Sequence, residues 1–280
     1  MAASRFLDAI RDRPLLLDAG MGLRLILNRS VGPSEDTSCA NVSYPNEVRR
    51  FHEEDVQAGS DAILTNTFGA NKQRLKYYNR QFGRKYIVPE INRRGVALAR
   101  EAAGPNRFVL GSIGLARVYT ATPDRDVEFA YRQQARILAE EGVDALILET
   151  HDFESASFAL RAIIREDAPP VVVSLYSWPD DAEGAARTLL DLGASVLGAN
   201  CGRSTADVVE CIERLAGRVD VPLLAKPGTT LDEGPDVFAA LVPRFLAMGV
   251  RLVGGCCGTT AEHVVSMRAA LDSSTGKVKG

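Results

Sequence analysis

Residues 127–149, VEFAYRQQARILAEEGVDALILE, contain the repeating unit that decides the fold. An amphipathic stretch at 127–142 ends in Gly142, and the short apolar run DALILE follows at 144–149. A glycine just after the last helical turn is typical of a helix C-cap. A short run that is almost continuously apolar is typical of a parallel strand buried on both faces. The unit therefore predicts a helix followed by a buried parallel strand.

The same unit recurs along the chain. Eight short apolar runs lie at 14–18, 61–66, 107–112, 144–149, 171–176, 195–200, 221–226 and 251–256. Helical patterns occupy 127–142, 154–166, 182–193, 206–217, 236–249 and 261–271, and C-capping glycines are expected at Gly142, Gly193, Gly217 and Gly249. Eight βα units in 280 residues predict an α/β fold, a single (β/α)8 TIM-type barrel. A doubly wound open sheet is the alternative, but no dinucleotide fingerprint supports it.

No linker or low-complexity segment divides the chain. We therefore expect one barrel domain over residues 1–272, followed by a disordered tail at 273–280. The least regular region, at about 19–45, is expected to form a long loop over the mouth of the barrel.

The composition is that of an ordinary soluble enzyme, with 46% hydrophobic and 25% charged residues. The net charge of -3 provides no basic surface for nucleic acid. The sequence contains no apolar run of ~18 residues, so no membrane span is expected. The N-terminus carries charges where a signal peptide needs an apolar core. A cytoplasmic location is expected. In a reducing compartment, five cysteines are thiols or metal ligands more often than disulfides.

Three of the five cysteines fall at predicted strand ends. Cys201 follows the sixth apolar run, while Cys256 and Cys257 end the eighth. The C-terminal strand ends of a barrel share one rim, so these thiols are expected to meet there. Three thiolates suit Zn2+, and three protein ligands leave the open fourth position of a catalytic site. Neighbouring glycines allow the sharp turn that this needs: Gly254, Gly255 and Gly258.

Two other interpretations of these cysteines remain. They could be buried free thiols, or Cys256 and Cys257 could form a vicinal disulfide. Cys211 lies within a helical pattern and is expected to pack in the core, while Cys39 is left unassigned.

Zinc bound by three thiolates is a weak activator of water, but it can lower the pKa of an incoming thiol. A thiolate can then attack an electrophilic methyl group. The open position is therefore expected to receive a substrate sulfur.

The motifs GANC (198–201) and GGCCGTT (254–260) resemble the zinc motifs of the homocysteine S-methyltransferase family. Further similar segments run in the same order through residues 14–271: LLLDAGMG (15–22), DAILTNTFGAN (61–71), GSIG (111–114), ILET (147–150) and AKPG (225–228). The resemblance implies a zinc-containing barrel that methylates homocysteine to methionine. Family donors include S-methylmethionine, betaine and methylcobalamin. The homocysteine-binding domain of cobalamin-dependent methionine synthase looks most similar.

The resemblance also implies a pocket for the amino acid. Asp18, Ala19 and Gly20 match a loop whose backbone meets the polar end of the acceptor. Thr65 matches a residue that contacts the carboxylate, and Glu149 matches the acid that pairs with the α-ammonium. Without the resemblance, Asp18 and Glu149 could equally be helix caps or members of structural ion pairs.

Two further residues adjoin these motifs. Asn200 is expected to steer the metal ligand beside it. His151 could act as a base, although a thiol deprotonated by zinc needs none.

The sequence departs from the family pattern at Leu23, Leu115 and Gly228, and the segment at 229–235 is short. These departures leave the acceptor and the donor open. The expected partners are a small-molecule thiol and a methyl donor. The alternatives are methyl transfer to or from another thiol, transfer through a separate corrinoid protein, or a non-catalytic zinc or redox-sensing role.

Overall fold

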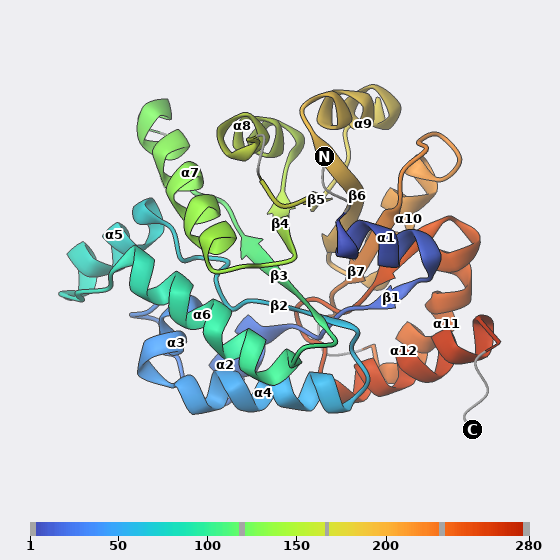
Figure 1. Ribbon diagram of the computed structural model, residues 1–280, viewed down its shortest axis with the longest axis horizontal. Coiled ribbons are helices and arrows are strands. Elements are labelled where there is room, and N and C mark those ends of the chain that lie inside the picture. The colour runs from blue at the N-terminus through green and yellow to red at the C-terminus, as the bar shows by residue number, and fades with distance from the viewer. Residues whose placement is uncertain (1–3, 118–120, 166–167, 230–232, 277–280) are drawn as a thin grey trace.

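The computed structural model describes residues 4–117, 121–165, 168–229 and 233–276. Its centre is one sheet of eight parallel strands with helices packed around the outside (Figure 1). The strands are β1 (Leu15–Leu16), β2 (Ala62–Leu64), β3 (Phe108–Ile113), β4 (Ala145–His151), β5 (Val171–Leu175), β6 (Ala194–Cys201), β7 (Leu223–Pro227) and β8 (Val250–Val253). Each predicted apolar run overlaps one strand. The predicted (β/α)8 barrel is confirmed.

The barrel is closed at the β1–β2 seam by aspartates. The sheet order runs from β1 through β8 and back down to β2, so β1 and β2 form no regular ladder. Instead, Leu16 exchanges hydrogen bonds with Asp61, through its carbonyl to the Asp61 N–H at 2.7 Å and through its N–H to Asp61 Oδ2 at 2.9 Å. The Leu64 N–H donates to Asp18 Oδ2 at 2.7 Å. Asp18 is therefore part of the seam.

The helices confirm the predicted pattern, with ends shifted by a few residues. They are α1 (Arg5–Asp12), α2 (Met21–Leu27), η1 (Thr37–Cys39), α3 (Ala40–Ser43), α4 (Pro45–Gln57), α5 (Lys72–Phe82), α6 (Val88–Ala103), α7 (Asp124–Glu140), α8 (Phe153–Ile163), α9 (Ala182–Asp191), α10 (Thr205–Leu215), α11 (Pro235–Ala247) and α12 (Ala261–Ser274). The four predicted capping glycines all have positive φ, between 71° and 103°. This is the left-handed conformation expected of a helix C-cap.

Two expectations differ from the structure. The region at 19–45 is not one long loop, because it contains α2, η1 and α3. These helices are too short to show a clear period. Leu25 of α2 and Ala40 of α3 pack in one cluster with Val48 and Phe51 of α4. The expected tail begins as helix, since the Ser273 and Ser274 hydroxyls donate to carbonyls one turn back within α12. Residues 277–280 lie outside the described residues.

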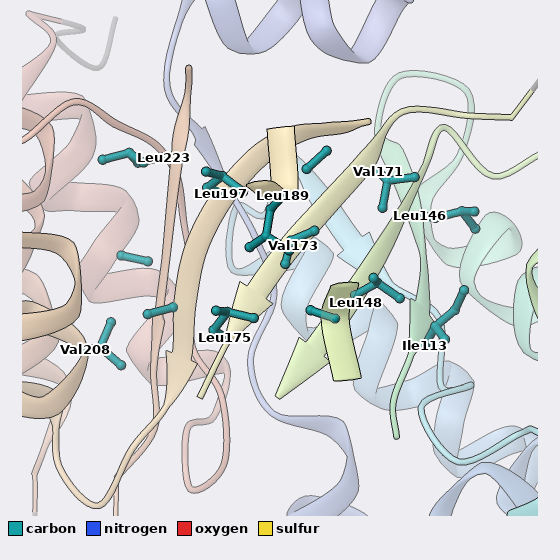
Figure 2. Packing of buried hydrophobic residues seen from close by; sticks show 14 of the residues in the cluster. Ile113, Leu146, Leu148, Val171, Val173, Leu175, Leu189, Leu197, Val208 and Leu223 are labelled. Atoms are coloured by element: carbon teal, nitrogen blue, oxygen red, sulfur yellow. The ribbon is translucent and has the colours of Figure 1, made fainter. Parts of the chain in front are cut away.

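Two hydrophobic layers hold the barrel together. Alternate strand residues point into the barrel and meet Phe6 and Ile10 of α1. The other strand residues point outward to the helices. Figure 2 shows this outer layer, in which Val173 and Leu197 face the same region as Leu189 of α9. In the described part of the chain, no helix is both long and apolar enough to cross a membrane.

The packing of β6 against β7 leaves no space for a side chain at Gly198. A Cβ added there would overlap the Leu224 carbonyl oxygen. We expect Gly198→Ala to lower the free energy of unfolding by about 1–3 kcal/mol, as overpacking of a core typically does. Gly32→Ala is the control, because a Cβ at Gly32 meets nothing within 4 Å. Urea unfolding of the two variants checks this, and equal stabilities would contradict it.

His52 of α4 makes the stability depend on pH. It is fully buried, neither ring nitrogen has a hydrogen-bond partner, and burial lowers its pKa from 6.5 to about 3. Between those two values only the unfolded chain binds the proton, so stability falls as the pH drops. Lowering the pH from about 7.5 to about 5 therefore reduces the free energy of unfolding by about 2 kcal/mol through this residue. We expect His52→Leu to lose correspondingly less stability over that interval in denaturant titrations. An equal loss in both proteins would contradict the assignment.

Candidate active site

The three predicted cysteines meet at the C-terminal end of the barrel. Cys201 is the last residue of β6, and Cys256 and Cys257 follow β8. Their sulfur atoms all lie within 4.8 Å of one another. Tetrahedral zinc with Zn–S bonds of about 2.3 Å requires sulfurs ~3.8 Å apart. The donor atoms therefore fit one metal ion with only small adjustments, and all three cysteines are free thiols here.

The end of β7 connects the two segments that carry the cysteines. The Gly228 N–H donates to the Cys201 carbonyl at 2.8 Å, and the Thr229 N–H donates to the Cys257 carbonyl at 2.8 Å. The Cys256 N–H donates to the Pro227 carbonyl, also at 2.8 Å. These backbone bonds determine how far apart the three thiols lie.

The backbone at the cysteines is unusual. Cys201 has a φ of +69°, in the left-handed region that few residues other than glycine occupy. Gly258 has a φ of +82°, and a Cβ there would overlap the Thr229 carbonyl oxygen. Strained conformations of this kind concentrate at functional sites, where the surroundings enforce them.

Hydrogen bonds among the three thiols shift their pKa values in opposite directions. Hydrogen bonds from the thiols of Cys201 and Cys256 lower the pKa of Cys257 to about 3. Donating these hydrogen bonds raises the pKa of the Cys201 thiol. The protonation of each thiol therefore depends on that of the other two.

Asn200 connects the sulfur cluster to the neighbouring strands. Its Nδ2 donates to Cys256 Sγ at 3.5 Å and to Thr150 Oγ1 at 2.8 Å. Its Oδ1 accepts from the Thr150 N–H at 3.0 Å and from Ser174 Oγ at 2.7 Å. Thr150 has a φ of +59°, at an irregularity in the β4–β5 pairing. All four polar positions of the buried Asn200 amide are thus engaged.

A cavity of about 240 Å³ adjoins the cysteines. Its walls include Asp18, Ala19, Gly20 and Glu149, together with all three cysteines. Four of the five residues expected to form the acceptor pocket therefore line one cavity with the sulfurs. Asn200 and Thr65 are not among the lining residues.

The hydrogen-bonding groups expected to receive the acceptor carboxylate are engaged within the protein. Thr65 Oγ1 lies 2.6 Å from Thr67 Oγ1 and accepts from the Ser112 N–H at 3.0 Å. The Gly20 N–H donates to Thr259 Oγ1 at 3.0 Å, and the Ala19 N–H donates to Asp55. None of these groups is free to bind a carboxylate in this conformation.

Sequence reasoning did not single out Lys226 of β7, the cation of this cavity. Lys226 is 3% exposed, and its Nζ lies 3.1 Å from Glu149 Oε1 and 3.7 Å from Asp18 Oδ1. Burial opposes its charge, but the two carboxylates outweigh burial and raise the pKa of Lys226. Burial also raises the pKa of Asp18 to about 7, although Lys226 acts in the opposite direction. A lysine within the apolar run VPLLAK was the signal available in the sequence.

The remaining candidates lie away from the cavity. His151 is buried, with Nε2 3.2 Å from Tyr131 Oη and Nδ1 2.9 Å from the Glu149 carbonyl, and burial lowers its pKa to about 4. Cys211 packs in the core within α10, as expected. Cys39 is fully buried in a cluster with Leu75 and Ile91.

Comparison with known proteins identifies the class of protein. Residues 15–271 match the model of the homocysteine S-methyltransferase family. The chain is 26% identical to methionine synthase from Mycobacterium leprae, covering 95% of this chain and 25% of that protein. It is 27% identical to betaine–homocysteine S-methyltransferase 1 from Xenopus tropicalis, covering 85% of this chain and 68% of that protein. The chain thus spans about a quarter of the methionine synthase that it matches.

Solved structures agree on the fold. The metallated form of the homocysteine methyltransferase MmuM from Escherichia coli superimposes with a TM-score of 0.78 at 22% identity, covering 94% of this chain and 99% of that one. The chain belongs to the homocysteine S-methyltransferase family, a family of S-methyltransferases.

Removing the Asn200 amide tests its role beside Cys256. We expect Asn200→Ala to weaken binding of a divalent metal by about 10–100-fold, the usual effect of losing a group that orients a metal ligand. Asn92→Ala is the control, since Asn92 is equally buried and donates two hydrogen bonds, but to carbonyls of Ala70 and Val88. Competition with a chromogenic chelator measures the affinity. Equal affinities in the two variants would rule out this role.

Proposed function

We propose that this chain transfers a methyl group to the thiol of homocysteine and so produces methionine, with Zn2+ held by Cys201, Cys256 and Cys257. The observation that supports this most strongly is the cavity that has three converging thiols in one wall and Asp18 and Glu149 in another. One part of the cavity suits a metal and a sulfur, and the other suits the polar end of a small molecule.

Zinc fits the site because its donors are three sulfurs, with no fourth ligand in the cluster among the residues that the structure describes. When bound, zinc supplies a lowered pKa for the acceptor thiol at neutral pH. The protein keeps the ligands in place through the hydrogen bonds from β7 and from Asn200. No separate base is required, which agrees with His151 being buried and bonded to Tyr131.

Glu149 positions the acceptor. Its Oε2 accepts from Ser112 Oγ at 2.6 Å, so the carboxylate is held rigidly at the cavity wall. A charge-assisted hydrogen bond to the acceptor ammonium is the contribution that we assign to it. Asp18 has its Oδ2 engaged by the Leu64 N–H and its Oδ1 without a hydrogen bond.

One observation favours a second candidate. Lys226 already lies between the two carboxylates, which suits methyl transfer to or from a thiol other than homocysteine. A methyl donor as partner, a separate corrinoid protein as the alternative route, and a cytoplasmic location remain predictions. Part of the short segment that motivated the corrinoid alternative, residues 230–232, lies outside the described residues.

Loss of one cysteine tests the proposed function. We expect Cys257→Ala to abolish both tight zinc binding and methyl transfer, because two sulfurs cannot replace the three-ligand site. Cys211→Ala is the control, since Cys211 packs in the core and should leave about one zinc per chain. Elemental analysis measures zinc, and methionine formation is assayed with S-methylmethionine, betaine and a methylated corrinoid. A fully zinc-loaded protein that methylates no thiol would contradict the proposal, as would an active Cys257→Ala variant.

A further inference from the structure

The ammonium of Lys226 lies where a cationic group of the acceptor is expected to bind. Its Nζ is within 3.1 Å of Glu149 Oε1 and 3.7 Å of Asp18 Oδ1. These are the carboxylates that the proposed function assigns to the polar end of the acceptor. Lys226 lines the same cavity and is almost completely buried. The protein therefore supplies its own cation at this position.

The cavity has little charge left for a second cation. Apart from the cysteines, the charged side chains among the described lining residues are Asp18, Glu149 and Lys226. They sum to one negative charge when Asp18 is ionised and to none when it is protonated, and burial raises the pKa of Asp18 to about 7. Glu149 already accepts hydrogen bonds on both oxygens, from Lys226 and Ser112. Of the four carboxylate oxygens of Asp18 and Glu149, Asp18 Oδ1 alone has no hydrogen bond to a described residue. An incoming ammonium would share this space with Lys226, and two like charges at such a distance repel strongly when buried.

A carboxylate on the acceptor also has few other partners. The Thr65 hydroxyl and the N–H groups of Ala19 and Gly20 are engaged by other protein groups. Among the described residues that line the cavity, Lys226 alone has a positively charged side chain. An ammonium on the acceptor therefore competes with Lys226, whereas a carboxylate is attracted to it.

We propose that Lys226 is a specificity-determining residue that acts as a tethered ammonium, competing with the amino group of the acceptor for Asp18 and Glu149. Two carboxylates alone would make the pocket prefer a thiol that carries an amino group over the same thiol without one. With Lys226 present, this preference is lower. This inference rests on the proposed function, in that the polar end of the acceptor must bind in this cavity.

The test compares two thioethers that differ only in the amino group: methionine and 4-(methylthio)butanoate. Their dissociation constants are measured by calorimetry on zinc-loaded protein, so the readout needs no methyl transfer. Lys226→Met removes the competing cation, and we expect it to raise the preference for methionine by at least about tenfold over the wild type. Lys226→Arg keeps a cation and is expected to stay close to the wild-type preference.

Lys226→Gln repeats the test with a neutral side chain that can still donate a hydrogen bond to Glu149, in case the methionine variant does not fold. A purely structural role would lower the melting temperature without changing the preference. An unchanged or reduced preference for methionine in a folded, zinc-loaded neutral variant overturns the inference. Absence of binding of both thioethers to every folded variant overturns it too, because the cavity would not then receive the polar end. Methyl transfer is assayed separately. A failure of the proposed function can therefore be distinguished from an unchanged preference and from an absence of thioether binding.

Discussion

The site depends on the hydrogen bonds that the end of β7 makes to the strands on both sides of it. Cys201 lies more than fifty residues before Cys256, yet both adjoin the Pro227–Thr229 backbone. Because β7 pairs with β6 and β8 in one parallel sheet, the two strand ends that carry cysteines lie on either side of it. Gly228 lies against Cys201 and Cys257, and a Cβ there would come within 3.2 Å of the Cys257 carbonyl oxygen. This crowding gives a structural reason for glycine at position 228.

The acidic wall of the cavity has both a structural and a chemical role. Asp18 uses Oδ2 to close the β1–β2 seam through the Leu64 N–H, and it presents Oδ1 near Lys226. Glu149 is held by Ser112 and Lys226. Burying two carboxylates without a cation would be costly, since unpaired buried charges are strongly destabilising. Lys226 offsets this cost, and for the same reason it affects which acceptor can bind.

The hydrogen bonds of Asn200 also constrain the positions of the cysteine thiols. Asn200 bridges Thr150 of β4, Ser174 of β5 and Cys256 after β8. The left-handed conformations of Thr150 and Cys201 lie on either side of this amide. Such conformations cost free energy, and the network of hydrogen bonds around Asn200 maintains them. The geometry of the thiols therefore comes from three strands together with the loop after β8.

The sequence alone determined the barrel, its eight strands and the three cysteines, because buried parallel strands and helix C-caps leave local patterns. It also pointed to Asp18 and Glu149 at strand ends. It could not show that Lys226 occupies the space between them, because that depends on β1, β4 and β7 meeting across the barrel. Nor could it show that the polar groups of Ala19, Gly20 and Thr65 already have hydrogen-bond partners within the protein. Most of these partners lie 36 to 239 residues away in the sequence. The remaining one, Thr67, belongs to the same turn as Thr65. Local periodicity records which residues face the core, whereas the pairing of charges and hydrogen bonds is decided only when distant strand ends are brought together.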